Sequence, residues 1–410
     1  MIVCLLAFAV SLPVALVSLS KLFLFVAGLV TLCASFSSPK AQLQPKNTWT
    51  YQVTVGIVLL MIVSLTWVEQ DLSIATTALV KHTKILEIIL IGVLIRTPRE
   101  AMIGMAALLV GQAWALSSSL LMAADLDVPW ISRATGLSTI EIQNVPYADS
   151  YLDQSMMFAT TSGIAWHLRR RFGRFEIVLK VLALGLLLNV FFLLPGRSGY
   201  IMGLATLVIG ATLATPPKLR AMTLLISPVI LATVLAVSSE RIYERGALLW
   251  SEFTSESARN DLSKSTSFRL AAWQASVVAI AERPVIGFGV GGWKVAIDQK
   301  TQDFVQERPQ PLQGNNPHQQ FLLWGVELGV FGIILACAFF IAIFLDAKKF
   351  PPDVKWATWS VGLSLLLASL FNSPLYDDLL GDYFCVALGL VLIYGRLCTG
   401  EQQITNKVPA

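Results

Sequence analysis

The sequence predicts an all-α polytopic membrane protein with about twelve transmembrane helices and one large loop outside the membrane. The first observation is composition: hydrophobic residues make up 55% of the 410 residues and charged residues 14%, whereas a soluble domain carries about 25% charged residues. The second is the mean hydropathy of +0.67. The third is the recurrence of apolar runs near the length of about 20 residues that a helix needs to cross a bilayer.

These apolar runs predict the membrane-spanning helices in order. Residues 2–19 have the composition of a signal-peptide core, but no Lys or Arg precedes them and further spans follow, so we interpret them as the first span. Lys81, His82, Lys84 and Glu87 interrupt the run 72–95, so its first half is also a candidate for a helix lying along the membrane surface. The twelve predicted spans are 2–19, 22–37, 52–68, 72–95, 101–123, 151–168, 177–195, 199–214, 221–238, 319–345, 356–373 and 379–396.

The distribution of Lys and Arg predicts the orientation of these spans, because positive residues favour cytoplasmic loops. With a cytoplasmic N-terminus, the inner loops and tail hold sixteen Lys and Arg residues, whereas the short outer loops hold three, Lys21, Arg133 and Arg197. We therefore expect both termini in the cytoplasm and the two longer loops, 124–150 and 239–318, on the outer face.

The second outer loop divides the chain into three predicted parts. Nine transmembrane helices occupy 1–238, the loop subdomain occupies 239–318, and three more transmembrane helices with a cytoplasmic tail occupy 319–410. The loop has nine basic and nine acidic residues, and the net charge of the whole chain is +4. This balance argues against a general polyanion-binding surface and gives no sign of a nucleic-acid partner.

One helix is expected inside this loop, from about 268 to 282. Ser265, Thr266 and Ser267 offer N-cap oxygens at its start, and its apolar residues recur three or four apart. A glycine-rich run, GFGVGG, follows at 287–292. It matches neither GxGxxG nor a P-loop, so no nucleotide cofactor is expected.

Three residues with suitable chemistry are expected at the outer membrane surface. Arg197 lies in a short turn between spans seven and eight, Arg269 opens the loop helix, and His318 stands where the loop re-enters the membrane. A guanidinium presents a planar fork that matches phosphate oxygens and stabilises charge on a leaving diphosphate. Histidine exchanges a proton near neutral pH. Together they predict a catalytic site where Arg197 and Arg269 bind a lipid-linked diphosphate and His318 activates an acceptor hydroxyl.

Each of these residues also has an ordinary interpretation when taken alone. Arg197 fits an interfacial anchor, Arg269 fits a solvated residue at a helix start, and His318 fits a common loop histidine. His318 has a second possible role at the site, as a hydrogen-bond donor to a diphosphate oxygen.

Two further groups of residues are weaker candidates. Lys81, His82 and Lys84 are expected to contact an anionic head group, or else to belong to a stretch lying on the membrane surface. Asp377, Asp378 and Asp382 form an acidic outer rim and are alternative general bases, or else part of a solvated turn.

No metal or other cofactor is expected. The five cysteines lie in or beside apolar runs without metal-like spacing, and neither HExxH nor a metal-binding acidic pair is present. Glu327 is a carboxylate inside a predicted span and so a functional candidate by position, although Gly325 and Gly329 beside it favour a buried structural role.

The predicted topology and three motifs resemble the O-antigen ligase and polymerase superfamily. The motifs are the RSG turn (197–199), the helix start at Arg269 running on to RPVIGFGVGGW (283–293), and the His318 segment leading into LLWGVELGVFG (322–332). The family commonly has His-Asn at the loop exit, whereas Gln319 follows His318 in this chain. Both residues offer an amide, so the departure concerns the neighbour more than the histidine.

The resemblance implies a GT-C-like glycosyltransferase that needs no metal and moves a glycan from undecaprenyl diphosphate to an acceptor. It implies a Gram-negative inner membrane and a site facing the periplasm. An O-antigen ligase, which transfers O-antigen to lipid A–core in lipopolysaccharide assembly, is the first expectation. A polymerase that extends undecaprenyl-diphosphate-linked repeats is the alternative, since the motifs do not separate the two.

A transporter or lipid flippase is the expectation from a different class. Such proteins place their sites near the bilayer midplane, often in repeated halves. The candidate residues of this chain lie at the outer rim instead, and no repeat is visible. The expected partners are therefore the undecaprenyl-diphosphate-linked glycan, the lipid A–core acceptor and the lipid bilayer.

Overall fold

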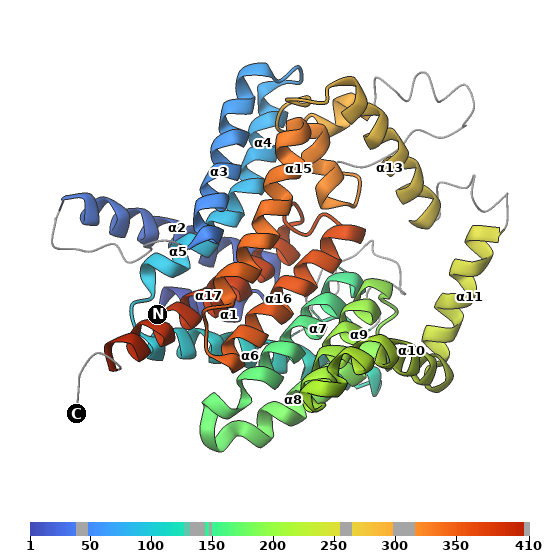
Figure 1. Ribbon diagram of the computed structural model, residues 1–410. Helices are drawn as coiled ribbons and strands as arrows, with labels where there is room; N and C mark the ends of the chain where they lie inside the picture. The colour runs from blue at the N-terminus through green and yellow to red at the C-terminus, as the bar shows by residue number, and fades with distance from the viewer. Residues whose placement is uncertain are drawn as a thin grey trace.

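The computed structural model describes residues 1–37, 48–126, 128, 130, 144–146, 150–254, 265–297 and 316–405. Within these residues every regular element is a helix (Figure 1). Most of the predicted outer loop 124–150, and two stretches of the large loop, 255–264 and 298–315, lie outside the described residues. The α-helices are α1 (Ile2–Ala9), α2 (Val14–Ser37), α3 (Trp49–Ser64), α4 (Leu72–Thr83), α5 (Glu87–Leu94), α6 (Pro98–Ala123), α7 (Tyr151–Leu168), α8 (Glu176–Phe192), α9 (Arg197–Ala214), α10 (Arg220–Ser238), α11 (Glu240–Thr254), α13 (Ser265–Glu282), α15 (Gln320–Ala347), α16 (Pro352–Phe371) and α17 (Asp378–Thr405).

Nine helical segments of the described chain are long and apolar enough to cross a membrane. One of them, Tyr151–Phe192, has 42 residues and comprises α7 and α8. The chain reverses between these two helices at Gly173, whose φ is +54°, and the helices pack against each other. Ten of the twelve predicted spans therefore fall on helices of sufficient length. The prediction of an all-helical, multi-pass membrane protein is confirmed at this level.

Two predicted spans are not continuous helices. In 2–19, α1 ends at Ala9 and α2 begins after Pro13, which fits a helix start but not a helix interior. The eight residues of α1 rise about 12 Å, too little to cross a bilayer. In 72–95, a 3₁₀ turn, Lys84–Leu86, separates α4 from α5. This turn lies among the charged residues that interrupt the apolar run.

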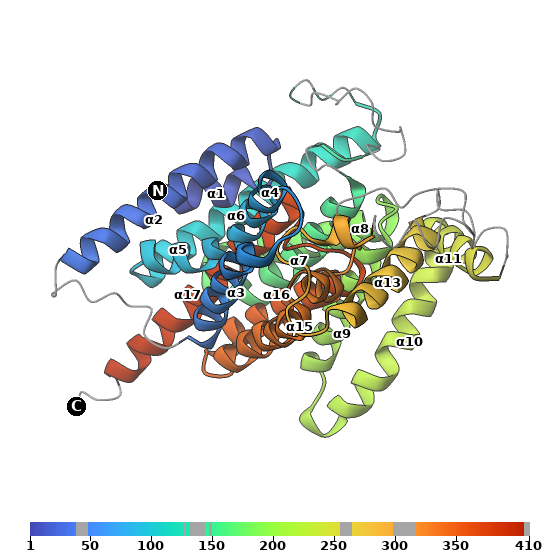
Figure 2. The ribbon, with the colours of Figure 1, turned by 90° about the horizontal axis from the view of Figure 1, so that it is seen from above.

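The helices pack around α17, which is the most buried of the membrane-length helices in the described chain. It contacts α5, α6 and α16. By contrast, α10 has no buried residue and lies at the edge of the bundle (Figure 2). Because its residues are apolar all round, we expect α10 to face lipid.

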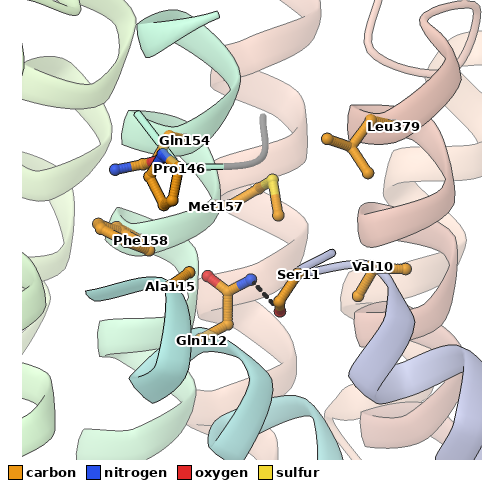
Figure 3. Close-up of a pocket in the computed structure, with 9 residues that line it drawn as sticks. All are labelled: Val10, Ser11, Gln112, Ala115, Pro146, Gln154, Met157, Phe158 and Leu379. Atoms are coloured by element: carbon orange, nitrogen blue, oxygen red, sulfur yellow. Dashed lines mark hydrogen bonds between the residues drawn. The ribbon is translucent and has the colours of Figure 1, made fainter. Parts of the chain in front are cut away.

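A cavity of about 10 Å³ remains between α1, α6, α7 and α17 (Figure 3), which is space for one water molecule at most.

Helix α15 bends sharply at Gly329, where φ is +63° and ψ is −147°. A straight helix would separate residues 324 and 332 by about 12 Å, yet a Cβ on Gly332 would lie 2.1 Å from the Trp324 carbonyl oxygen. The segment Gln320–Leu328 therefore folds back on the rest of the helix. The predicted span 319–345 therefore falls on two helical segments that meet at Gly329.

The glycine-rich run packs onto this bend. The backbone N–H of Phe288 donates to the carbonyl of Val326 at 2.9 Å, and that of Val330 donates to the carbonyl of Pro284 at 2.7 Å. Gly287 has a φ of +66°, and a Cβ there would lie 2.4 Å from the Val326 oxygen. The run 287–292 thus has a structural role in which its backbone approaches α15 closely.

We expect Gly329→Ala to destabilise the protein. A Cβ at this position would meet the backbone of Val285 at 2.4 Å, and the positive φ adds strain. The loss should be at least about 2 kcal/mol, seen as a lower thermal unfolding midpoint of the purified protein in detergent. Gly210→Ala is the matched control, because Gly210 lies inside α9 with no atom within 4 Å of the added carbon. Equal midpoints for the two variants would contradict the packing described here.

Candidate functional site

His318 lies between the start of α13 and the turn that joins α16 to α17. Its Nδ1 is 3.0 Å from Oδ1 of Asn372, and its ring meets the Phe268 ring edge-on with centroids 5.9 Å apart. Its backbone has a φ of +50°, an uncommon conformation for a residue other than glycine. The His318 N–H donates to the side chain of Asn316 at 2.8 Å, which fixes this turn.

The two glutamines after His318 attach it to the rest of the fold. The Oε1 of Gln319 accepts the N–H of Leu322 at 2.5 Å and so caps the start of α15. The Oε1 of Gln320, which is fully buried, accepts the N–H of Leu375 at 3.0 Å. The departure from His-Asn therefore has a local explanation, since the amide of Gln319 serves as a helix cap.

Arg197 and Arg269 come together at the adjoining ends of α9 and α13. The guanidinium of Arg197 donates to Oγ1 of Thr266 at 3.2 Å. Helix α13 begins at Ser265, three residues earlier than expected, so Thr266 lies in its first turn. Both arginines are half-buried. Burial lowers the pKa of Arg269, and the nearby charge of Arg197 lowers it further.

The three predicted residues thus form one cluster in the structure. Burial lowers the pKa of His318, the positive charge of Arg269 lowers it further, and the hydrogen bond with Asn372 opposes these effects. Trp273, one turn beyond Arg269, donates its indole N–H to the carbonyl of Pro317 at 3.0 Å. This bond ties α13 to the segment that carries His318, although 44 residues separate its two partners.

The turn Asn372–Asp378 borders the cluster of Arg197, Arg269 and His318. Burial raises the pKa of Asp377 to about 6, against the charges of Lys84 and Lys81 and a hydrogen bond from Asn372. The charge of Asp377 also acts on Arg269. Asp377 therefore belongs to the same site as the arginines. Asn372 was not among the predicted residues, since a lone polar residue at the end of a predicted span carries no recognisable signal.

Lys84 and Lys81 lie on the other side of this turn. The Lys84 amine is buried and donates to the carbonyl of Asp377 at 2.5 Å, with the carbonyls of Tyr376 and Asp378 at 3.4 and 3.5 Å. The Lys81 amine lies 3.5 Å from the Asp378 carboxylate and 5.1 Å from the centre of the Tyr376 ring. Lys84 thus holds the turn, whereas Lys81 is partly open to solvent.

Both lysines line a cavity of about 310 Å³ between α2 and α4. Leu22, Phe25 and Val80 provide its apolar lining, and Lys21, Lys81, Lys84 and Asp378 provide its charged groups. A cavity of this kind suits a ligand with both an anionic and an apolar part. It adjoins the arginine cluster through the Asn372–Asp378 turn.

Asp382 pairs with Lys21. It is buried, and both of its carboxylate oxygens accept from the amine of Lys21, at 2.9 and 2.8 Å. In the described part of the chain no contact joins Asp382 to His318 or Arg269. Of the three alternative bases, Asp377 is therefore the one that the structure brings into the cluster, and Asp378 faces the lysines instead.

Glu327 has a buried partner. Its Oε2 lies 2.9 Å from Nε2 of His82, and its Oε1 accepts the N–H of Gly291 at 2.8 Å. Both side chains are almost completely buried, with 1% of each exposed. The pair links α4, the glycine-rich run and the bend of α15, so the structural interpretation of Glu327 fits these contacts.

Residues 181–337 match the model of the O-antigen ligase family. The matched segment contains Arg197, Arg269 and His318. The match confirms the superfamily that the sequence predicted. Members of this family are membrane enzymes of glycosyltransferase type, ligases or polymerases, which act on lipid-linked glycans in lipopolysaccharide biosynthesis. No match to a curated protein was found.

The turn Asn372–Asp378 and both lysines lie outside the matched segment. Their place in the site therefore rests on the structure alone. Among the described residues no group of three or more His, Cys, Asp or Glu side chains is arranged to hold a metal ion.

We expect Lys84→Met to lower stability and Lys81→Met to weaken binding of the lipid-linked donor. Removing the buried Lys84 amine takes a charged donor away from the carbonyls of the turn, which costs about 1.5–3 kcal/mol, so the thermal midpoint and the transfer rate should fall together. Removing the Lys81 amine should leave the free energy of unfolding within about 0.5 kcal/mol of that of the unmodified protein and raise the KM for the lipid-linked donor. An unchanged KM in Lys81→Met would exclude Lys81 from donor binding.

Proposed function

We propose that this protein is an O-antigen ligase, which transfers O-antigen from undecaprenyl diphosphate to lipid A–core at the periplasmic face of the inner membrane. The observation that carries the proposal is the clustering of Arg197 and Arg269 beside His318, from three segments far apart in sequence. The family match supports the reaction class. The concentration of Lys and Arg in alternate loops supports the orientation.

The electrostatics of the cluster favour an anion. Two half-buried guanidinium groups repel each other, and the repulsion raises the cost of holding them together without a ligand. A diphosphate between them would relieve this repulsion and accept charge-assisted hydrogen bonds from both. The lysine-lined cavity beyond the Asn372–Asp378 turn supports a second contact of the lipid-linked substrate with Lys81.

In the proposed reaction an acceptor hydroxyl attacks the sugar carbon that is bonded to the diphosphate. A carbon–oxygen bond forms, the bond to the diphosphate breaks, and undecaprenyl diphosphate leaves with the electron pair. Arg197 and Arg269 stabilise the charge that develops on the leaving group. The hydroxyl proton passes to His318, and Asp377 is the alternative acceptor. Because the arginines supply the positive charge, the reaction needs no metal ion.

The acceptor distinguishes a ligase from a polymerase, since both break the same bond. Purified protein is incubated with an undecaprenyl-diphosphate-linked glycan and rough lipopolysaccharide, and the products are separated on a gel. A ladder on lipid A–core supports the ligase. Longer lipid-linked chains without that ladder would identify a polymerase. If neither product forms, the transporter is the function class that remains.

Arg197→Ala and Arg269→Ala should each reduce transfer by roughly 10- to 150-fold, because each removes a charge-assisted interaction worth about 1.5–3 kcal/mol. Arg→Lys at either position should be nearly as damaging, since the amine keeps the charge but loses the planar fork. Initial rates in the gel assay measure this, with membrane insertion and yield as controls. Full activity in both alanine variants would remove the arginines from the mechanism.

Transfer by the unmodified protein should be constant between about pH 7 and 8 and should fall at lower pH as His318 takes up a proton. Since burial and Arg269 lower the pKa of His318 below its usual value near 6.5, the fall should begin below that pH. The glutamine in His318→Gln cannot accept the proton, so the transfer rate should fall by about 100-fold or more. If His318→Gln keeps near-normal turnover while Asp377→Asn abolishes it, Asp377 is the base instead.

A further inference from the structure

Asn372 lies between His318 and Asp377. Its Oδ1 is 3.0 Å from Nδ1 of His318, and its side chain is near enough to Asp377 to lower the pKa of that carboxyl, against the larger effect of burial. Asn372 is buried, with 7% of its surface exposed. It is the residue directly after α16 (Pro352–Phe371). The three side chains therefore form a row from Asp377 through Asn372 to the imidazole, in which Asn372 and the imidazole are at hydrogen-bonding distance.

The direction of this row follows from the chemistry of its members. Oδ1 of Asn372 faces His318, so its NH₂ group is the part of the amide available to Asp377, and an ionised carboxylate only accepts hydrogen bonds. The amide oxygen then faces His318, and an oxygen of this kind also only accepts. Nδ1 of His318 must therefore carry the hydrogen. A neutral imidazole carries one hydrogen, so its Nε2 is left with a free lone pair.

We propose that Asn372 is a positioning residue for the transfer reaction, which holds His318 in the Nδ1–H tautomer and presents Nε2 as the proton acceptor, while Asp377 fixes the direction of the Asn372 amide. This inference rests on the proposed function, because it assigns Nε2 to the acceptor hydroxyl. The left-handed backbone at His318 and the Asn316 side chain that holds it fix the other end of the row.

The groups around His318 favour its neutral form. Arg269 acts on it from α13 and opposes a positive imidazole, and Arg197 on α9 lies near Arg269. The Phe268 ring covers one edge and adds no charge. Asp377 is the carboxylate that reaches the histidine through Asn372. The imidazole is thus uncharged at neutral pH and keeps the lone pair that a base needs.

The tautomer can be observed directly, because the chain contains three histidines. Full-length protein with nitrogen-15-labelled histidine, reconstituted in lipid, gives three sets of imidazole nitrogen signals. His318→Gln identifies the set that belongs to His318 by its loss. We expect a protonated Nδ1 and an unprotonated Nε2 for His318 at pH 7.5. In Asn372→Ala we expect this pattern to be lost in favour of a mixture or of the other tautomer.

The kinetics provide a second readout. Asn372→Ala should lower kcat by about 10- to 100-fold, as part of the 10²–10⁴-fold that a positioned base contributes, and leave the donor KM within about twofold because both arginines remain. The acidic limb of the pH profile should move to lower pH, since the hydrogen bond with Asn372 raises the pKa of His318 and is now absent.

The exchange Asn372→Asp with Asp377→Asn is a test that keeps the row. An acceptor oxygen remains at 372 and a donor amide is placed at 377, so the Nδ1–H tautomer should persist. A carboxylate beside Nδ1 stabilises the charged imidazole, so the acidic limb should move to higher pH. Because this exchange changes side-chain volumes very little, it remains informative if Asn372→Ala fails to fold.

Gln112→Leu is the matched control. Gln112 is another buried amide, on α6, and donates to Oγ of Ser11 at 2.8 Å (Figure 3). Its removal should change neither the tautomer nor the pH profile.

The inference is overturned if Asn372→Ala keeps the Nδ1–H tautomer and the pH profile of the unmodified protein, or if the exchange variant loses the tautomer. The nitrogen signals need no turnover, so the row is tested even if the protein lacks ligase activity. Conversely, His318→Gln could lose transfer while Asn372→Ala transfers normally. That result would be compatible with the proposed function and would exclude a positioning role for Asn372.

Discussion

The turn between α16 and α17, residues Asn372–Asp378, is the element on which the site depends. Its backbone N–H at Leu375 is held by Gln320, and its carbonyls around Asp377 are held by the buried amine of Lys84. These bonds connect the C-terminal helices to the start of α15 and to the α4–α5 break. Because Gln320 and Lys84 are both buried, they hold the turn so that it can position side chains on its two sides.

The bend of α15 is the second constraint. If α15 were straight from Gln320, its first two turns would continue along the axis of the membrane-crossing part, and His318 would be carried away from Asn372. The break at Gly329 turns those residues back, and the glycine-rich run fills the space against them. The buried pair of His82 and Glu327 then joins this region to α4. These glycines therefore affect the candidate site indirectly, because they help to decide where His318 lies.

Much of the architecture could be predicted because a bilayer imposes a simple length and polarity rule on each helix. That rule identified ten of the membrane-length helices, and it failed in 2–19, where Pro13 divides the apolar run. Arg197, Arg269 and His318 could be grouped because topology places them on one face, with the family resemblance fixing the choice. Their mutual approach in the structure agrees with that grouping.

The contacts that decide detailed roles could not be predicted. Lys84 and Lys81 are three residues apart and alike in sequence, yet Lys84 holds three backbone carbonyls, whereas Lys81 lies beside the Asp378 carboxylate and is partly open to solvent. Asp382 was grouped with Asp377, but its partner is Lys21, 361 residues away. Asn372 has no distinguishing sequence context at all. Each of these roles depends on a partner that is distant in the chain, and local patterns carry no information about it.

The central claim is that Arg197 and Arg269 form a diphosphate site. Native mass spectrometry of the purified full-length protein with undecaprenyl diphosphate or undecaprenyl monophosphate tests it without turnover. Since each charge-assisted contact is worth about 1.5–3 kcal/mol, the account predicts at least about tenfold tighter binding of the diphosphate. It also predicts loss of that preference in the Arg197→Ala, Arg269→Ala double variant. Equal binding of the two lipids, or an unchanged preference in the double variant, would contradict the account.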